Sequence, residues 1–548
     1  MTGPGVLQPL GETLTQRQKM LVVGALMISM FVGAIDQTVV STAMPRIVAE
    51  LGGFGLLSWV FTSYMLSSTV VVPLVGKLSD TFGRKWFILG GIAVFQIGSL
   101  ACGAAPNIES LIAFRALQGI GGGAIMASVF ATIGDLFPPA ERGKYMGMFT
   151  GTFSLASILG PTVGGLITDN IGWRWVFYVN IPIGLVAIPA VWFNLPARRL
   201  PGKVKIDWIG AFLLSAASVL FLLALVWAGD KYAWGSREIV GLVAASAALL
   251  AAFIFQEIRH ESPMVPLHLF RNRVFLLSNL TVFMIGMGMF GSIAYLPTFV
   301  QTALGASATA SGVVTTPQSL GLLVASVIGG QVISRTGRYR WQTILGAALF
   351  LIAMGLLTTL EVGMPRWHVS AFMVFLGAGI GLVMPTQSLV IQNAVPYQYL
   401  GVSSSAGQFF RQIGGVFGTA IFGTILANSY HASFDDHVPA AVQQAMPAPI
   451  LERFDDPTLQ LDPRTFAVVR QQVLALPNGE ATFAAAAEGQ KLAVADAVTH
   501  IFVFSTVVAG VCLLVTFFIP ELPLRRQIGA GGPPSAAGPP GPQGPFEG

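Results

Sequence analysis

Runs of about twenty mostly apolar residues recur along the whole chain, and they constrain its fold more than any other feature. A helix rises 1.5 Å per residue, so about twenty residues cross the roughly 30 Å hydrocarbon layer of a bilayer. Only 10% of the residues are charged, whereas soluble domains carry about 25%. Continuous apolar blocks also exclude the short alternating segments of a transmembrane barrel. The sequence therefore predicts an all-α polytopic membrane protein.

Hydropathy divides these runs into fourteen predicted spans. Six lie near residues 18–44, 55–76, 86–105, 108–134, 143–168 and 175–195. Two follow near residues 206–229 and 238–257, and the last six lie near 275–301, 310–333, 341–361, 367–393, 400–428 and 498–520. An even number of spans places both termini on the same side of the membrane.

Lys and Arg are unevenly distributed between the two sides. The connections on the side of the termini hold 19 of them, and the short connections opposite hold five. Cytoplasmic loops carry this excess in membrane proteins. Both termini are therefore predicted to be cytoplasmic, in a protein of the cell inner membrane. The net charge of +5 follows from this topology, and no nucleic-acid partner is expected.

The two halves of the chain repeat each other. GKLSDTFGRK, residues 76–85, matches GQVISRTGRY, residues 330–339, at an offset of 254 residues. The fifth and thirteenth spans align at the same offset, with Gly147 on Gly401. Such a repeat predicts two six-helix bundles with pseudo-twofold symmetry about the membrane normal, and two intervening transmembrane helices. The substrate path should run between the bundles.

The predicted organisation has five parts. These are a cytoplasmic N-terminus (1–17), an N-terminal bundle (18–198), two linker helices (199–262), a C-terminal bundle (263–525) and a disordered cytoplasmic tail (526–548). The tail is too rich in Pro and Gly to pack. The C-terminal bundle includes a predicted extracytoplasmic loop, residues 430–496, with a helical Ala-rich stretch near residues 481–498. A small cap and a mobile loop are both compatible with its composition.

Five motifs resemble a known family. GKLSDTFGRK is similar to the cytoplasmic signature loop of the major facilitator superfamily. The others resemble its fourteen-span drug:proton antiporter branch (EmrB/QacA type): AIDQTVVSTAMPRI (34–47), RALQGIGGG (115–123), GPTVGG (160–165) and WRWVFYVNIPIG (173–184). The resemblance implies a proton-coupled exporter of small amphipathic or apolar compounds, of the multidrug efflux type linked to antibiotic resistance. Its partners would be substrate, protons and the bilayer, without a cofactor, in a monomer.

Other functions are weighed against this one. A dedicated exporter of one metabolite, such as a lipid, siderophore, peptide or natural product, is the first alternative, and a sensor built on a transporter fold is the second. An enzyme is not expected, because the spans hold no His pair, Ser-His-Asp set or HExxH motif. The GxxxxGK[ST] motif of an ATP-driven pump is also missing from the sequence.

Asp36 is the candidate proton carrier, because hydropathy places no other carboxylate well inside a span. An ionised carboxylate there costs at least about 2.5–3.5 kcal/mol, so intramembrane acids are functional candidates. The alternative is a structural Asp bonded to a neighbouring helix. The resemblance implies a role in proton transfer for Arg115 as well, which could pair with Asp36 or simply extend to the membrane interface.

The signature loop is a candidate conformational latch. Gly76 and Gly83 allow a tight turn, and Asp80 could accept hydrogen bonds from a helix N-terminus or from Arg84. The resemblance implies that Asp80, Arg84 and Lys85 hold the cytoplasmic side closed; basic residues that only set the topology are the alternative. Ser334 replaces Asp80 in the second copy, so a weaker latch is expected there.

GPTVGG is the candidate antiporter motif. Its Gly160, Pro161, Gly164 and Gly165 permit close helix approach and a kink, although such residues would serve packing in any bundle. A soft, weakly polar cavity is expected to bind substrate. Its candidate lining comes from the motif-bearing spans and their repeat partners: Gln37, Gln118, Met126, Gln318, Gln387, Gln392, Asn393, Gln408 and Arg411.

Overall fold

The computed structural model describes residues 10–51, 56–197, 205–229, 231–457, 459 and 463–527. Fourteen helices in these ranges are long and apolar enough to cross a membrane, which confirms the predicted number. The prediction of a disordered tail falls almost wholly on residues 528–548, outside the described part of the chain. The division into five parts by residue number stays a prediction.

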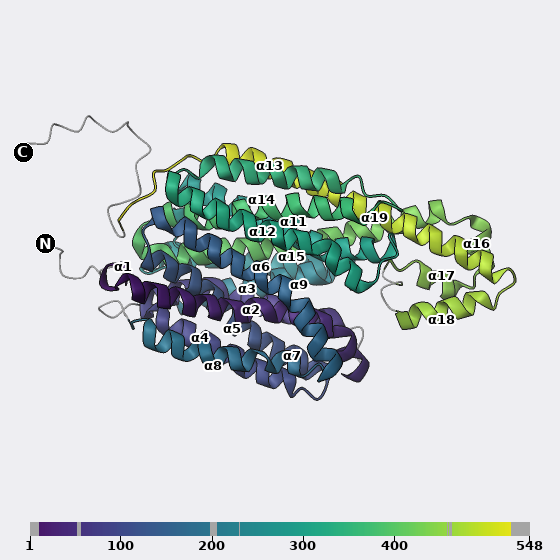
Figure 1. Ribbon diagram of the computed structural model, residues 1–548, viewed down its shortest axis with the longest axis horizontal. Helices are drawn as coiled ribbons and strands as arrows, with labels where there is room; N and C mark the ends of the chain where they lie inside the picture. The colour runs from purple at the N-terminus through teal and green to yellow at the C-terminus, as the bar shows by residue number, and fades with distance from the viewer. Residues whose placement is uncertain are drawn as a thin grey trace, which may run out of the picture.

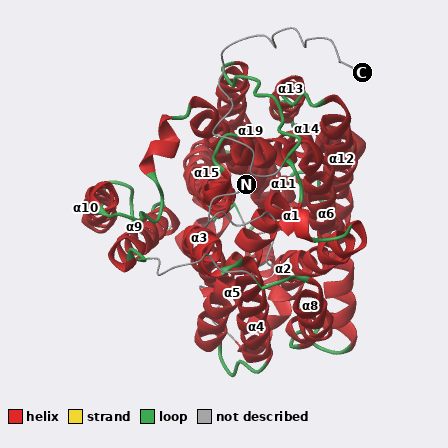
Figure 2. Cartoon of the chain, turned by 90° about the vertical axis from the view of Figure 1, so that its left-hand side faces the viewer, coloured by secondary structure: helices red, strands yellow, loops and turns green. Residues whose placement is uncertain are grey.

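The spanning helices from the N-terminal part of the sequence form one group. They are α2 (Gln16–Leu51), α3 (Leu57–Phe82), α4 (Arg84–Gly103), α5 (Ile108–Leu136), α6 (Pro139–Asn170) and α8 (Asn180–Asn194), with short α1 (Leu10–Thr13) and α7 (Trp175–Tyr178). The pair α9 (Trp208–Trp227) and α10 (Arg237–Arg259) follows. This pair stands to one side of the other helices (Figure 2).

The remaining spanning helices form a second group. They are α11 (Arg273–Thr302), α12 (Ala308–Thr336), α13 (Arg340–Leu357), α14 (Arg366–Asn393), α15 (Leu400–His437) and α19 (Gly479–Phe517). Short helices η2 (Leu267–Arg271) and η3 (Tyr397–Tyr399) precede α11 and α15. Three more, α16 (Ala440–Ala445), α17 (Ala448–Phe454) and α18 (Pro463–Leu474), lie beyond one end of the bundle (Figure 1).

Helix packing repeats between the two groups. In the first group α2 packs on α6 and α8, and α5 packs on α3 and α4. In the second group α11 packs on α15 and α19, and α14 packs on α12 and α13. The groups meet where α6 packs on α12 and α3 packs on α15. These pairs correspond under the sequence repeat, so the repeat is a repeat of structure.

The turns after α3 and α12 show the same correspondence. Gly83 has φ 95° and Gly337 has φ 70°, which is backbone that glycine adopts without strain. The two positions are 254 residues apart, as the sequence repeat requires. We call this end of the molecule the latch end.

Large apolar side chains cover the outside of the bundle, as a lipid-facing surface requires. Trp residues lie exposed near the helix ends, where aromatic rings favour the membrane interface. Trp86, Trp192, Trp208 and Trp341 lie near the latch end, and Trp175, Trp234 and Trp367 lie near the other end.

In residues 430–496 the Ala-rich stretch is helical, as predicted, but the two flanking spans reach further into this segment than the predicted ends at 428 and 498. α15 continues to His437, and the last spanning helix already begins at Gly479, so the Ala-rich stretch is helical and continuous with that span. Tyr430, Phe434 and Val438 recur every four residues and are buried in one core with Ala486 and Ala493 of α19. This apolar spacing was hidden in a polar, Pro-containing stretch. With α16, α17 and α18, the segment forms a helical cap.

Candidate functional site

Asp36 lies in the middle of α2 at the centre of a fully buried polar cluster. Its Oδ2 accepts a hydrogen bond from Arg115 Nη1 at 2.6 Å, and its Oδ1 accepts from Gln118 Nε2 and Asn180 Nδ2, both at 2.8 Å. Ser99 Oγ accepts from the same two amides. Asp36, Ser99, Arg115, Gln118 and Asn180 are the Asp36 cluster, and none of them is more than 1% exposed.

The cluster joins four helices of the first group. Asp36 comes from α2, Ser99 from α4, Arg115 and Gln118 from α5, and Asn180 from α8. The ion pair between Asp36 and Arg115 therefore balances two charges that each helix alone would carry into the membrane. Ser99 and Asn180 were not predicted from the sequence. The only available signal was the position of Asn180 inside the WRWVFYVNIPIG motif.

Tyr64 separates the Asp36 cluster from a central cavity. The Arg115 guanidinium lies 4.5 Å from the centre of the Tyr64 ring, and the same tyrosine lines the cavity. Gln37, the neighbour of Asp36 on α2, also lines it. The candidate proton carrier is thus one side chain away from the cavity.

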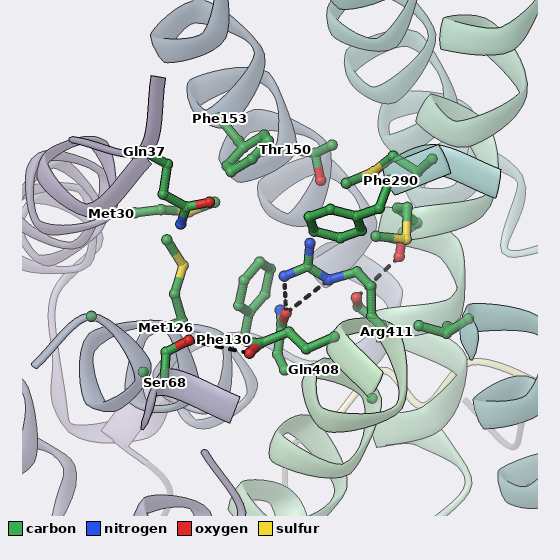
Figure 3. A pocket seen from close by; sticks show the side chains of 18 of the residues that line it. Met30, Gln37, Ser68, Met126, Phe130, Thr150, Phe153, Phe290, Gln408 and Arg411 are labelled. Atoms are coloured by element: carbon green, nitrogen blue, oxygen red, sulfur yellow. Dashed lines mark hydrogen bonds between the residues drawn. The ribbon is translucent and has the colours of Figure 1, made fainter. Parts of the chain in front are cut away.

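The cavity lies between the two helix groups, and its empty space together with the adjoining open solvent amounts to about 1100 Å³. Its walls are mostly apolar and flexible, with five methionines and several phenylalanines. Figure 3 shows Met30, Met126, Phe130, Phe153 and Phe290 around it, with Gln37, Gln408 and Arg411 pointing inward. Such walls suit bulky amphipathic molecules.

Only part of the predicted lining reaches this cavity. Gln37, Met126, Gln408 and Arg411 line it. The other predicted residues are not among the lining residues; four of them form hydrogen bonds elsewhere, and Gln318 packs against another helix. Gln118 belongs to the Asp36 cluster, the Gln387 amide donates to Thr343 Oγ1 at 3.4 Å, and the Asn393 amide donates to the Pro523 carbonyl at 3.5 Å. The Gln318 backbone packs against Gly377 of α14, and Gln392 bonds the Phe130 carbonyl and Ser404.

Helical phase explains these corrections. On α14 the cavity is lined by Ile380, Met384, Ser388 and Ile391, which recur every three or four residues. Gln387 is the residue before Ser388, and one residue corresponds to about 100° of rotation around the helix. Its side chain therefore faces α13 instead of the cavity. Phe130 lies four residues after Met126 on α5, so it also lines the cavity, although it was not predicted from the sequence.

Two of the predicted latch residues, Asp80 and Arg84, meet at the latch end. Asp80 bonds Arg84, and its two oxygens accept from the backbone N–H groups of Gly401 and Val402 at 3.0 and 3.1 Å. These N–H groups begin α15, where the helix dipole favours a negative charge. Arg84 Nε also donates to Asp135 at 2.9 Å. Asp80 of the first group thus holds the first turn of a helix of the second group.

Gly76 allows this close approach. A Cβ atom at Gly76 would collide with the side chain of Ser405 on α15. Lys85, in contrast, takes no part in the latch: its Nζ donates to the Trp192 carbonyl at 2.6 Å and lies 5.2 Å from the Trp192 ring centre. The residue after Arg84 on α4 faces α8 and the interface, which corrects the expectation for Lys85.

The second copy of the latch uses a neutral group in the same place. Ser334 Oγ accepts a hydrogen bond from the Lys144 N–H at 2.9 Å, near the start of α6. Gly143 and Gly330 approach each other closely beside it. The weaker hold expected of Ser334 stays a prediction.

The chain after α19 adds a further contact at the latch end. The Arg525 carbonyl accepts from the Ala140 N–H of α6 at 3.1 Å, so this segment of the second half bridges to the first. Tyr339 anchors the segment by donating to the Pro520 carbonyl and accepting from the Leu522 N–H. Burial raises the pKa of Tyr339 to about 12, so its hydroxyl remains a donor.

The candidate antiporter motif packs α6 against α2. A Cβ at Gly160 would collide with the Thr38 side chain, and one at Gly164 would collide with Thr42. Gly165 faces open space and Pro161 is exposed, while α6 remains continuous through this proline. The motif therefore provides a close helix contact one turn from Asp36.

Two repeated helix groups around a central cavity, with contacts between the groups at one end, are the architecture of a multi-pass membrane transporter. The sequence profile described as Major Facilitator Superfamily matches residues 26–419, and the chain belongs to this family. It is thus a transporter and not an enzyme.

The relatives agree with this assignment. The chain is 40% identical over 425 residues to "Multidrug transporter protein MdtP" of Bacillus subtilis (strain 168), covering 77% of this chain and 78% of that protein. It is 38% identical over 429 residues to "Multidrug resistance protein 3" of the same organism, covering 78% and 83%. The proton:xylose symporter XylE shares the fold, with TM-score 0.59, 15% identity and coverage of 93% and 97%.

Proposed function

We propose that this protein is a proton-coupled antiporter that exports small amphipathic or largely apolar compounds from the cell. It would work by alternating access in the cell inner membrane, with both termini in the cytoplasm. The observation that carries the proposal is the complete burial of Asp36 beside the cavity. Two relatives that are named as multidrug proteins support efflux as the direction of transport.

The Asp36–Arg115 pair supports a coupling role because its two charge states require different surroundings. An ionised Asp36 holds Arg115 at 2.6 Å and accepts two further amide hydrogen bonds. A protonated Asp36 no longer attracts the guanidinium, which is then free to turn toward the Tyr64 side of the cavity. Protonation from outside and release to the cytoplasm would thus couple the proton to rearrangement of the cavity wall.

The latch supports a conformational cycle. The Asp80 bonds to α15, the α6–α12 contact and the Ala140–Arg525 hydrogen bond all join the two groups at the latch end. Opening the cavity toward that end must break them together. In the proposed cycle, the arrangement with these contacts formed would be the state closed at the latch end.

Transport by reconstituted protein tests this proposal. Liposomes with an imposed pH gradient would be offered a panel of neutral, cationic and anionic amphipathic fluorophores, with and without nigericin to collapse the gradient. Gradient-dependent movement of several compounds is the expected result. Equal rates with and without nigericin would overturn proton coupling, and movement of a single compound would indicate a dedicated metabolite exporter.

A further inference from the structure

We propose that the central cavity selects amphipathic anions, and that Arg411 binds their carboxylate or an equivalent acidic group. This inference rests on the proposed efflux function and names its substrate class. Among the described residues that line the cavity, Arg411 is the only one with a charged side chain.

The charge of Arg411 is not balanced by the protein. Arg84 and Arg115 each pair with a carboxylate, whereas Arg411 forms no ion pair with any described residue. Its Nε and Nη2 both donate to the Oε1 of Gln408, at 3.1 and 2.5 Å. Because this amide is neutral, the positive charge remains available to a ligand.

The geometry of the guanidinium fits an acidic group. Nη1 donates to no described residue, and Figure 3 shows the planar group inside the cavity between Gln408 and Phe290. A guanidinium binds a carboxylate through two parallel hydrogen bonds, and exchange of the Gln408 contact would free the second donor. A buried positive charge in the membrane is stabilised most by a counter-ion, which the ligand would supply.

The rest of the cavity requires an apolar body on that anion. Met289 and Phe290 of α11, with Met126 and Phe130 of α5, present polarizable surface around Arg411. Gln37 and Gln412 add neutral polar groups. No carboxylate stands among the described lining residues to attract a cation, and the charge of Arg411 repels a cationic amphiphile. Aromatic and aliphatic carboxylates of drug size match both features.

Matched ligands separate charge from shape. We would measure dissociation constants of the full-length protein in nanodiscs for anthracene-2-carboxylate, anthracene-2-carboxamide and anthracen-2-ylmethylammonium. The carboxylate should bind about 10- to 100-fold more tightly than the carboxamide, the range for a hydrogen bond to a charged group, and the ammonium should bind most weakly. Equal binding of carboxylate and carboxamide by the parent protein would overturn the inference.

Three variants assign the preference to Arg411. Arg411→Gln should abolish the preference for the carboxylate while the carboxamide constant stays within about twofold. Arg411→Lys should retain part of the preference, because lysine keeps the positive charge but cannot form two parallel hydrogen bonds to a carboxylate. The control Arg366→Gln removes an exposed charge at the start of α14 and should change nothing. If a folded Arg411→Gln protein loses affinity for the carboxylate and the carboxamide equally, Arg411 supports the shape of the cavity and does not bind the acidic group.

Transport in the same vesicles distinguishes this inference from the proposed function. Export of an anion in exchange for protons carries one more charge per cycle than export of its neutral amide, so an imposed membrane potential should accelerate the carboxylate more. If the carboxamide is driven by the pH gradient and the carboxylate is not preferred, the inference fails and the antiporter stands. If no compound follows the gradient, the antiporter itself fails. If Arg411→Gln does not fold, the parent ligand series and Arg411→Lys still decide.

Discussion

At the scale of single residues, Asp36 and Arg115 depend on each other inside the bundle. Both are sealed from water, and each is the other's ion-pair partner. Arg115→Met should therefore lower the free energy of unfolding by about 3–5 kcal/mol, because a buried carboxylate loses its counter-charge. The double variant Asp36→Asn with Arg115→Met should recover a part of this loss.

Thermal unfolding of the purified variants in one detergent checks this pair. A double-mutant cycle separates the interaction from the effect of each substitution alone. Losses that simply add in the double variant would show that the two side chains do not stabilise each other, and the Asp36 cluster would then be a set of independent hydrogen bonds.

The sequence predicted Asp36 because a carboxylate inside an apolar run is conspicuous, and the family resemblance implied Arg115. The sequence did not predict which glutamines face the cavity, because a polar amide is compatible with either side of a helix. Gln37 and Gln387 both lie inside spans, yet the first lines the cavity and the second bonds Thr343. The difference depends on helix rotation, which the neighbouring helices determine.

At the scale of helices, the GPTVGG motif contains a matched pair of glycines. A Cβ at Gly160 would collide with Thr38, while one at Gly165 meets no atom within 4 Å. Gly160→Ala should destabilise the protein by about 1–3 kcal/mol through overpacking of α6 on α2. Gly165→Ala should be neutral or stabilise it by up to about 1 kcal/mol, since alanine is the better helix former.

Unfolding of these two variants is followed by circular dichroism under identical conditions. If Gly160→Ala is as stable as Gly165→Ala, the close α2–α6 contact is not required in the folded state. A role of the motif in export would then need another explanation than helix packing.

Helix ends could be predicted where the apolar composition of the span determines them. They could not be predicted where packing against another helix determines them. The spans up to α14 begin and end within several residues of the hydropathy prediction. The ends of α15 and α19 extend far beyond it, because Tyr430 and Phe434 pack against the Ala-rich start of α19. Polar residues on the outer face masked that apolar spacing.

At the scale of the whole molecule, small residues allow the two groups to approach each other closely near the latch end. A Cβ at Gly147 on α6 would collide with the Ser326 carbonyl on α12. Gly147→Val should therefore disfavour the closed arrangement by about 1–3 kcal/mol and increase the population that is open at the latch end. Gly90→Val, at a position with no atom within 4 Å, is the control.

Cysteine accessibility measures this shift. A cysteine introduced at Ser388 in the cavity would be labelled in inside-out vesicles with a membrane-impermeant maleimide; the native Cys102 and Cys512 are buried. Gly147→Val should accelerate labelling over the parent and over Gly90→Val. Unchanged labelling would mean that the α6–α12 contact does not control access from the latch end.

The sequence repeat predicted the arrangement of the whole molecule better than it predicted the site. Equivalent glycines at 83 and 337 and equivalent helix pairs follow from one duplicated pattern. The cavity lies between the copies, where the repeat is broken: Arg411 of α15 stands where the first copy has Ser157. The sequence shows that this arginine occurs in only one half of the repeat. It does not show which side chains contact Arg411, because those contacts depend on how the helices pack.

Substrate-driven proton movement tests the central claim most directly. Vesicles that contain pyranine would report pH as a transported compound is added, with parent protein, Asp36→Asn, or Asp496→Asn as a control in the helical cap. The account predicts proton flux in the parent and the control, and none in Asp36→Asn although that variant still binds the compound. Proton flux at the parental rate in Asp36→Asn would contradict it.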